Sequence, residues 1–471
     1  KGILMADAKV VIKNIFSLTA AEAVSRILTF VYTVYLLRVL SPSGYGIIYL
    51  SKSTIAIFLI IAALGLDSIG TREIAKNKSN INPIVNNIFT IRLISAIIVY
   101  FFLLIFVSLM DYPTYDKTAI MLMGINIFST SLLLNWTFQG LQKMEVFAMR
   151  AIIVNVLNFV GIFLFIKNPG DTILAIVVIA ASALINMLWL IFYYTRQFGK
   201  ISFQFDLDLW KRLMKSSMPI AISLIFVAIY GNIGVLLLGS FKSQYEVGIY
   251  GAGFNILLLA GVLSSILQNV FFPVFPEKKT NSDRLKMVKN FSRLNFAAGT
   301  FISLFIFVFA DYIALIFGEE YTRSISVIRI LMLSNLIVFY TLTLYSPLIA
   351  WDKERQVFFS NLAGLVVGVL ANIILIPYFA ENGVAFSSVL CEFAVFIVVA
   401  IIFYRDYHTI LLLDFIKYFI IAGISTIPFL LFKMNIVIAI LAMIASFGLF
   451  VLLNFLFKTV TIQEIKTLLK K

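Results

Sequence analysis

Residues 19–53 read TAAEAVSRILTFVYTVYLLRVLSPSGYGIIYLSKS, which is two apolar runs joined by a Ser-Pro-Ser-Gly turn at positions 41–44. Three ionisable residues, Glu22, Arg26 and Lys52, lie within these runs. A charged side chain near the middle of a bilayer costs roughly 2.5–3.5 kcal/mol on insertion scales, and it is normally kept only where it faces a bundle interior or a water-filled cavity. The stretch therefore predicts two membrane helices whose cations face a polar, membrane-enclosed cavity.

The spacing of the charges supports this interpretation. Glu22 and Arg26 are four residues apart, so they share one face of the first predicted helix. A helical rise of about 1.5 Å per residue places Lys52 roughly 12 Å and Arg26 roughly 21 Å from the outer helix ends. In a simpler alternative, Arg26 pairs only with Glu22, and Lys52 extends towards the outer headgroups.

The composition excludes a soluble globular protein. Of 471 residues, 61% are hydrophobic and only 13% are charged, which is typical of a polytopic membrane protein. The net charge of +14 fits the excess of Lys and Arg in cytoplasmic loops, so no nucleic-acid partner is predicted. The single cysteine, Cys391, and the single histidine, His408, leave little for metal chemistry, and neither a metal nor a cofactor is predicted.

The apolar runs divide the chain into fourteen predicted membrane segments of about 20 residues or more. They cover approximately residues 14–40, 44–70, 84–110, 117–140, 146–167, 172–195, 213–240, 246–275, 290–318, 324–350, 355–379, 383–404, 411–432 and 435–457. With the N-terminus in the cytoplasm, most Lys and Arg residues between segments fall on the cytoplasmic side, as the positive-inside rule requires. The pattern predicts an all-α, multi-pass protein of a prokaryotic plasma membrane, with both termini in the cytoplasm.

The chain also contains an internal repeat. The stretch 37–49 is similar to 238–250, and the stretch 87–92 is similar to 290–293. Six helices in each half would give the halves the same orientation, so we expect an axis along the membrane normal, a central cavity and alternating access. The predicted domains are a six-helix lobe over 1–200, a second over 201–408, and two further helices with a basic tail over 409–471.

The predicted cavity charge belongs to the first half alone. When Gly46 is aligned with Gly248, the second half has no cation opposite Arg26 or Lys52. A neutral or cationic substrate would not need these cations, whereas guanidinium and ammonium groups are strong partners for phosphate in a low dielectric. Arg26 and Lys52, together with Glu22, are the predicted diphosphate-binding residues.

Three further groups of residues are candidates for a role in transport. An ion-pair cluster at the cytoplasmic mouth is predicted for Asp67, Arg72, Glu73 and Arg92, and it is either structural or a gate that breaks and re-forms. Tyr45 and Tyr49 are candidates for stacking on sugars. Oxygen-bearing residues of the second half are candidates for coupling to Na⁺ or H⁺, although hydrogen bonding between helices is the commoner role of such side chains. They are Asn232, Asn255, Asn372, Ser388 and Glu392.

Several short motifs, in a shared order, resemble the polysaccharide-biosynthesis or Wzx-type flippases of the multidrug/oligosaccharidyl-lipid/polysaccharide exporter (MOP) superfamily. The resemblance covers essentially the whole chain. The motifs are LSPSGYGI at 40–47, ALGLD at 63–67, TREIA at 71–75, YEVGIYGA at 245–252, FPVF at 272–275, GEEY at 318–321 and PYFAENGVAFS at 377–387.

The resemblance implies fourteen helices in two lobes around a V-shaped cavity. It also implies translocation of a polyprenyl-diphosphate-linked oligosaccharide to the outer leaflet for surface polysaccharide or glycan assembly. Arg26 and Lys52 match the cations that this family carries in helices 1 and 2. Several relatives have a further cation in helices 7 and 8, which this chain lacks. The expected partners are the lipid-linked substrate, membrane lipids, and glycosyltransferases or a polymerase of the same pathway, and the protein is expected to be a monomer.

Two other functions remain open from sequence. An ion-coupled, MATE-like exporter of small organic cations would need an acidic cavity, while helices 1 and 2 offer mainly basic groups. A membrane glycosyltransferase or polymerase would need catalytic carboxylates or a metal site, and the short outer connections contain only Glu319-Glu320 as adjacent acids. We therefore predict a flippase rather than an enzyme, driven by an Na⁺ or H⁺ gradient or by the membrane potential.

Overall fold

The structure is a computed structural model that describes residues 24–78, 80–277, 280–409, 412–431 and 435–457. These residues are almost entirely helical, and none of them forms a strand. Eleven stretches of described helix are long and apolar enough to span a membrane. When α15 is counted as two helices, and when α16 and the helix of residues 24–39 are added, the described residues form fourteen segments. The predicted all-α, multi-pass membrane fold is confirmed.

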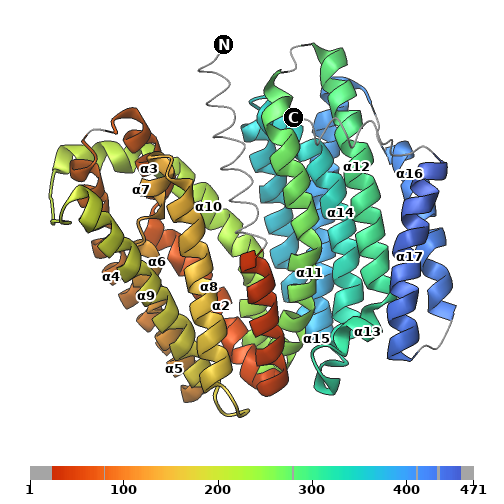
Figure 1. The fold of residues 1–471 in the computed structure, drawn as a ribbon, viewed down its shortest axis with the longest axis horizontal. Helices are drawn as coiled ribbons and strands as arrows, with labels where there is room; N and C mark the ends of the chain where they lie inside the picture. Colours follow the sequence, from red (N-terminus) through yellow and green to blue (C-terminus); the bar gives the residue numbers. More distant parts are fainter. Residues whose placement is uncertain (1–23, 79, 278–279, 410–411, 432–434, 458–471) are drawn as a thin grey trace. The chain divides into compact units, whose positions relative to one another are not determined.

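Contacts within the chain define two compact units, Lys1–Gly248 and Ile249–Lys471 (Figure 1). The lobe limits predicted at residues 200 and 408 stay a prediction. After the helix of residues 24–39, the first unit contains α2 (Pro42–Ala63), α3 (Leu66–Lys76), α4 (Asn82–Leu109), α5 (Thr114–Met123), α6 (Asn126–Ser131), α7 (Asn135–Gly140), α8 (Met144–Phe165), α9 (Thr172–Phe198) and α10 (Leu207–Phe241). From the unit boundary onwards come α11 (Gln244–Phe271), η1 (Phe272–Glu277), α12 (Asn281–Val308), α13 (Ala310–Ala314), η2 (Glu319–Tyr321), α14 (Ser324–Ala350), α15 (Glu354–Tyr407), α16 (Leu412–Thr426), η3 (Ile427–Leu431) and α17 (Ile436–Leu456).

The second membrane helix begins as its sequence suggests and ends earlier than expected. The Ser41 side chain accepts a hydrogen bond from the Gly44 N–H, and Pro42 occupies the first turn, where its missing N–H is not needed. The helix stops at Ala63 because Leu64 and Gly65 adopt left-handed φ angles of 54° and 66°. The predicted single run over 44–70 is therefore two helices, α2 and α3.

The break between the predicted helices 355–379 and 383–404 lies within α15. Ala380 has φ 48° and ψ −124°, and these dihedral angles are not helical. Pro377, three residues earlier, removes a backbone hydrogen bond of the helix at the same place. The next residue, Glu381, is only 1% exposed and pairs with Arg323 at 2.7 Å. This ion pair ties the break to the residue just before α14.

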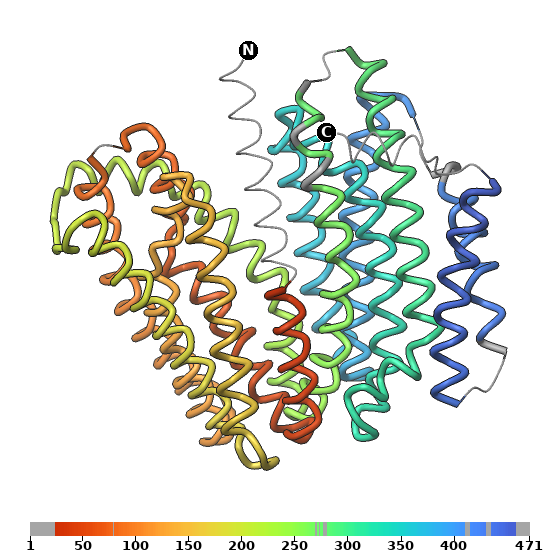
Figure 2. Tube along the Cα trace, in the orientation of Figure 1, coloured from red at the N-terminus to blue at the C-terminus, as the bar shows by residue number. Residues whose placement is uncertain are grey.

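An extended connection fastens the start of α10 to the first unit. We call residues 199–206 the strap; it follows α9 and lies along the edge of the unit (Figure 2, left). Asn86 and Ser202 exchange two hydrogen bonds, of 2.9 Å and 3.2 Å, and the backbone N–H of Gln204 donates to Thr90 Oγ1 at 3.2 Å. Polar side chains of α4 thus accept hydrogen bonds from the backbone N–H groups of the strap, as a neighbouring strand would in a sheet.

Asn87 is the centre of this attachment. Its Oδ1 accepts from the backbone N–H of Asp206 at 3.0 Å and from Trp210 Nε1 at 2.8 Å. Its Nδ2 donates to Pro83 O and to Gln204 Oε1. The side chain is 2% exposed, so water cannot easily replace these partners.

Asn87→Ala is therefore expected to loosen the strap by about 1–3 kcal/mol, because two donors lose their acceptor. Limited trypsin digestion followed by mass spectrometry should show faster cleavage after Lys200. Ser223→Ala is the control on α10, because its hydroxyl bonds a carbonyl of its own helix. Equal protection of the wild type and Asn87→Ala would contradict this account of the strap.

Candidate functional site

The helix of residues 24–39 is held against α8 by polar and aromatic contacts. Thr29 Oγ1 donates to Asn155 Oδ1 at 2.9 Å, and the Tyr35 hydroxyl donates to Ile166 O at 2.8 Å. The rings of Tyr35 and Phe163 stack with centroids 4.1 Å apart. These contacts fix the rotation of the helix that carries Arg26.

The two predicted diphosphate-binding cations lie within the first unit. Arg26 and Lys52 are both half-buried, and Glu22 lies outside the described residues. Lys52 comes ten residues after the start of α2 at Pro42, which is about 15 Å along the helix axis and near half the hydrocarbon thickness. Its two neighbours in sequence, Ser51 and Ser53, are buried at 0% and 5% exposure.

Lys52 has no ionic partner in the part of the chain that the structure describes. No carboxylate lies within 4.0 Å of its ammonium, and none of the hydrogen bonds among these residues involves it. An ammonium group at this depth without a counter-ion is costly, so a protein normally keeps it to bind an anion or to face water. This arrangement can receive the negative charge of a phosphate.

Of the predicted gate residues, the structure joins Asp67 to Arg92. Arg92 is 2% exposed, and its Nη2 lies 2.6 Å from Asp67 Oδ2. Neither Arg92 Nε nor Nη1 has a hydrogen-bond partner among the residues that the structure describes. Asp67, whose side chain is 49% exposed, is thus the carboxylate that compensates a buried guanidinium in α4.

Asp67→Asn is expected to destabilise the protein by about 2–3 kcal/mol, because Arg92 would remain buried without its anion. The value lies below that of a fully buried pair, since water reaches Asp67. Thermal unfolding in detergent would measure the loss, and Asp67→Asn/Arg92→Met should recover most of it. If Asp67→Asn is as stable as the wild type, the ion pair between Asp67 and Arg92 does not contribute to stability.

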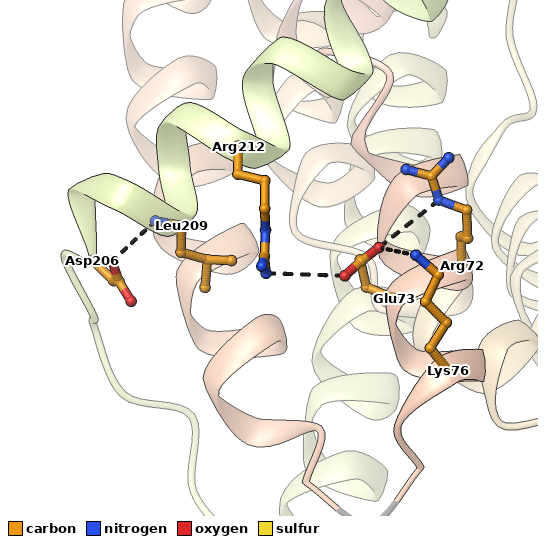
Figure 3. Close-up of polar contacts among 6 residues, drawn as sticks. All are labelled: Arg72, Glu73, Lys76, Asp206, Leu209 and Arg212. Carbon is orange, nitrogen blue, oxygen red and sulfur yellow. Dashed lines mark hydrogen bonds and ion pairs between the residues drawn. The ribbon is translucent and has the colours of Figure 1, made fainter.

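The third predicted gate residue, Arg72, belongs to a different cluster (Figure 3). Its Nε lies 3.8 Å from Glu73 Oε1, and Lys76 Nζ lies 2.9 Å from the same oxygen. Arg212 of α10 approaches the other carboxylate oxygen of Glu73 at 4.0 Å. Glu73, which the sequence placed beside Arg72 in the predicted cluster, therefore lies close to two cations of α3 and makes a longer contact with Arg212 of α10.

The two tyrosines proposed to contact sugars stack on one another. Their ring centroids are 6.2 Å apart with an angle of 21° between the planes. Tyr45 is 3% exposed, while Tyr49 is half-buried. Tyr49 is thus the more accessible of the two, and the sugar contact stays a prediction.

The residues proposed for ion coupling lie in both units. Asn232 belongs to the first unit, and the other four belong to α11 and α15 of the second. Four of the five side chains bond the carbonyl four residues earlier in their own helix; these four are Asn232, Asn255, Asn372 and Ser388. Glu392 lies four residues after Ser388 and shares its face of α15. Ion binding by this set stays a prediction.

A close helix crossing, which the sequence did not predict, lies at the start of α11. A Cβ added to Gly46 would lie 1.8 Å from Gln244 O, and one added to Gly248 would lie 1.9 Å from Pro42 O. Gly46 thus contacts the carbonyl of the residue four before Gly248, and Gly248 contacts the carbonyl of the residue four before Gly46. The repeat alignment had already paired Gly46 with Gly248, and this was the one signal of the contact in the sequence.

Gln244 also fastens this crossing to α5. Its Nε2 donates to Asp116 Oδ2 at 2.6 Å, and the Asp116 side chain is 4% exposed. Nearby, the hydroxyl groups of Tyr112 and Ser240 are 3.0 Å apart. Burial raises the pKa of Tyr112, so its hydroxyl stays protonated and available as a donor.

These features define the class of the protein as an all-helical, multi-pass membrane protein with charged groups inside its spans. Solved structures share the fold. The lipid II flippase MurJ in an inward closed conformation superposes with a TM-score of 0.73 at 13% identity, covering 93% of this chain and 98% of that chain. An inward-facing multidrug resistance transporter of the MATE family superposes with a TM-score of 0.63 at 16% identity, covering 81% and 94%.

The family follows from the sequence comparisons. The model of the polysaccharide biosynthesis protein family matches residues 11–279, more than half of the chain, so the chain belongs to that family. A protein named for O-antigen transport in Shigella dysenteriae is 24% identical over 388 residues, covering 81% of this chain and 96% of the relative. The capsular polysaccharide biosynthesis protein CapF of Staphylococcus aureus is 22% identical over 399 residues, covering 82% and 97%.

Proposed function

We propose that this protein moves a polyprenyl-diphosphate-linked oligosaccharide from the cytoplasmic to the outer leaflet of a prokaryotic plasma membrane. The observation that carries the proposal is the half-buried Lys52, which lies about 15 Å into α2 and has no carboxylate partner among the described residues. Membership of the polysaccharide biosynthesis family and the relative named for O-antigen transport support a saccharide cargo.

In this mechanism the cations of the first lobe neutralise the diphosphate. Arg26 and Lys52 bind the phosphate oxygens, while the polyprenyl tail stays in the lipid. Alternating access then exposes the head group on the other side. The cycle is driven by an Na⁺ or H⁺ gradient or by the membrane potential, and Glu392 with its neighbours on α15 is the candidate coupling site.

The alternative of a multidrug exporter receives less support. The likeness to MATE transporters concerns the fold, which flippases and drug exporters share. An exporter of organic cations needs an acidic cavity, and the ammonium group of Lys52, which has no carboxylate partner among the described residues, would repel such a substrate.

Deletion of the gene in its source cell tests the cargo directly. We expect loss of one surface glycan and accumulation of its lipid-linked oligosaccharide on the cytoplasmic leaflet, measured with a membrane-impermeant glycosidase on oriented vesicles. A normal surface glycan combined with loss of cationic dye efflux would replace the proposal with the exporter.

A further inference from the structure

The strap has two faces with different chemistry. Its hydrogen bonds to α4 use the alternate residues Ser202, Gln204 and Asp206. The residues between and after them, Phe203, Phe205 and Leu207, are 63%, 65% and 63% exposed. The ring of Phe203 lies 6.4 Å from that of Phe89 on α4, and the ring of Phe205 lies 5.7 Å from that of Trp210. Even so, most of the surface of both rings is exposed, because an extended chain alternates its side chains. Three large apolar side chains are thus presented together on the surface of the first unit.

This apolar face lies at the level where α10 leaves the membrane. The 35 residues of α10 extend for about 52 Å, which exceeds the roughly 30 Å of hydrocarbon. The turns before Pro219 carry the cations, so they form the part of α10 that lies outside the hydrocarbon. The strap bonds Asn86 and Thr90, which lie about 6 Å and 12 Å from the start of α4 along its axis. Since α4 is about 42 Å long and the hydrocarbon occupies only about 30 Å, the strap lies near the boundary between headgroups and acyl chains.

Cations flank the apolar residues on both sides in the sequence. Lys211, Lys215 and Lys200 are exposed, as is Arg196 in the last turn of α9. Arg212 is 66% exposed and approaches Glu73 at only 4.0 Å, as Figure 3 shows. The opposite face of the first turns of α10 packs into the apolar core through Leu213, which is 1% exposed. The cations on the outer face thus remain available to a partner.

We propose that the strap and the first turns of α10 form an anchor for anionic phospholipids of the cytoplasmic leaflet. Phe203, Phe205 and Leu207 insert at the level of the upper acyl chains, and the flanking Lys and Arg residues pair with lipid phosphates. Apolar side chains combined with a basic flank are the combination by which a surface segment binds an anionic bilayer. A soluble protein partner would not reach apolar side chains at the level of the acyl chains. The anchor is independent of the transported substrate.

Spin labels test the position of the anchor in full-length protein reconstituted into nanodiscs. In a Cys391→Ser background, labels at Phe203→Cys and Phe205→Cys should collide more with oxygen than with a water-soluble nickel reagent. Adding phosphatidylglycerol to phosphatidylcholine should increase this difference. A label at Lys286→Cys, an exposed position near the start of α12, should report water in both lipids. Water-like accessibility at 203 and 205 in both lipids would overturn the proposal.

Charge variants test the lipid specificity. Native mass spectrometry of the protein released from mixed lipid should show that Lys211→Gln/Lys215→Gln loses phosphatidylglycerol affinity by about 25-fold, since each cation near an anionic surface contributes about fivefold. The matched control is Lys286→Gln/Lys289→Gln, which removes the same charge from α12 and should retain its lipid. An equal loss in both variants would show nonspecific charge attraction, and no loss in either would show that the patch serves another partner; both results overturn the proposal.

Discussion

Replacing Arg26 and Lys52 together with alanine is expected to reduce transport of a diphosphate-linked substrate by at least about 100-fold. A hydrogen bond to a charged group contributes about 1.5–3 kcal/mol, and the double variant removes two such partners from the phosphates. The fold should tolerate the loss of the Lys52 ammonium, since no described carboxylate depends on it as a partner. The single variants should each lose about tenfold or more.

The control for this result is Arg38→Ala, which removes an exposed cation from the end of the same helix. It should transport at the wild-type rate. Lys52→Arg should keep much of the activity because it keeps the charge, although an arginine presents a planar fork in place of a point charge. Full transport by Arg26→Ala/Lys52→Ala at normal expression would remove these residues from the site.

The second large effect is expected at the glycine crossing. Gly46→Ala should destabilise the protein by about 1–3 kcal/mol or more, because its Cβ would lie 1.8 Å from the backbone oxygen of Gln244. No rotamer change can relieve a clash with backbone, so α2 and the start of α11 must separate. Gly248→Ala should have a similar effect, since its Cβ would lie 1.9 Å from Pro42 O.

Two glycines in neighbouring spans provide matched controls. Gly231 in α10 and Gly261 in α11 have no atom within 4 Å of an added Cβ. Alanine at either position should leave the unfolding midpoint in detergent unchanged or raise it slightly, because alanine favours helix. If Gly46→Ala unfolds at the same midpoint as Gly231→Ala, the close crossing does not contribute to stability.

The number and order of the membrane helices could be predicted from sequence because each span needs a long apolar run, and such runs are visible without any knowledge of packing. The break at Ala380 was predictable for the same reason, since PYFAENG interrupts an apolar pattern after Pro377. The break after Ala63 was missed because Leu64 is apolar, and only its left-handed backbone ends the helix.

The polar contacts were harder to predict because they depend on which faces meet. The strap follows from hydrogen bonds between Asn87 on α4 and an extended segment more than a hundred residues later, and no periodic pattern encodes such a pairing. Arg72 was grouped with Asp67, Glu73 and Arg92 by position in the chain, but the structure separates its contact with Glu73 from the Asp67–Arg92 pair. The importance of Lys52, which has no carboxylate partner among the described residues, was predictable because a charged side chain within an apolar run is costly to bury.

Reconstitution into proteoliposomes tests the central claim most directly. Vesicles would contain a defined polyprenyl-diphosphate oligosaccharide on one leaflet, and a membrane-impermeant glycosidase would report its arrival on the other, with and without Na⁺ and pH gradients. We predict protein-dependent transfer that requires the diphosphate and is lost in Arg26→Ala/Lys52→Ala, together with no transport of a cationic dye. Transport of the dye, without transfer of the lipid-linked oligosaccharide under any gradient, would contradict the account.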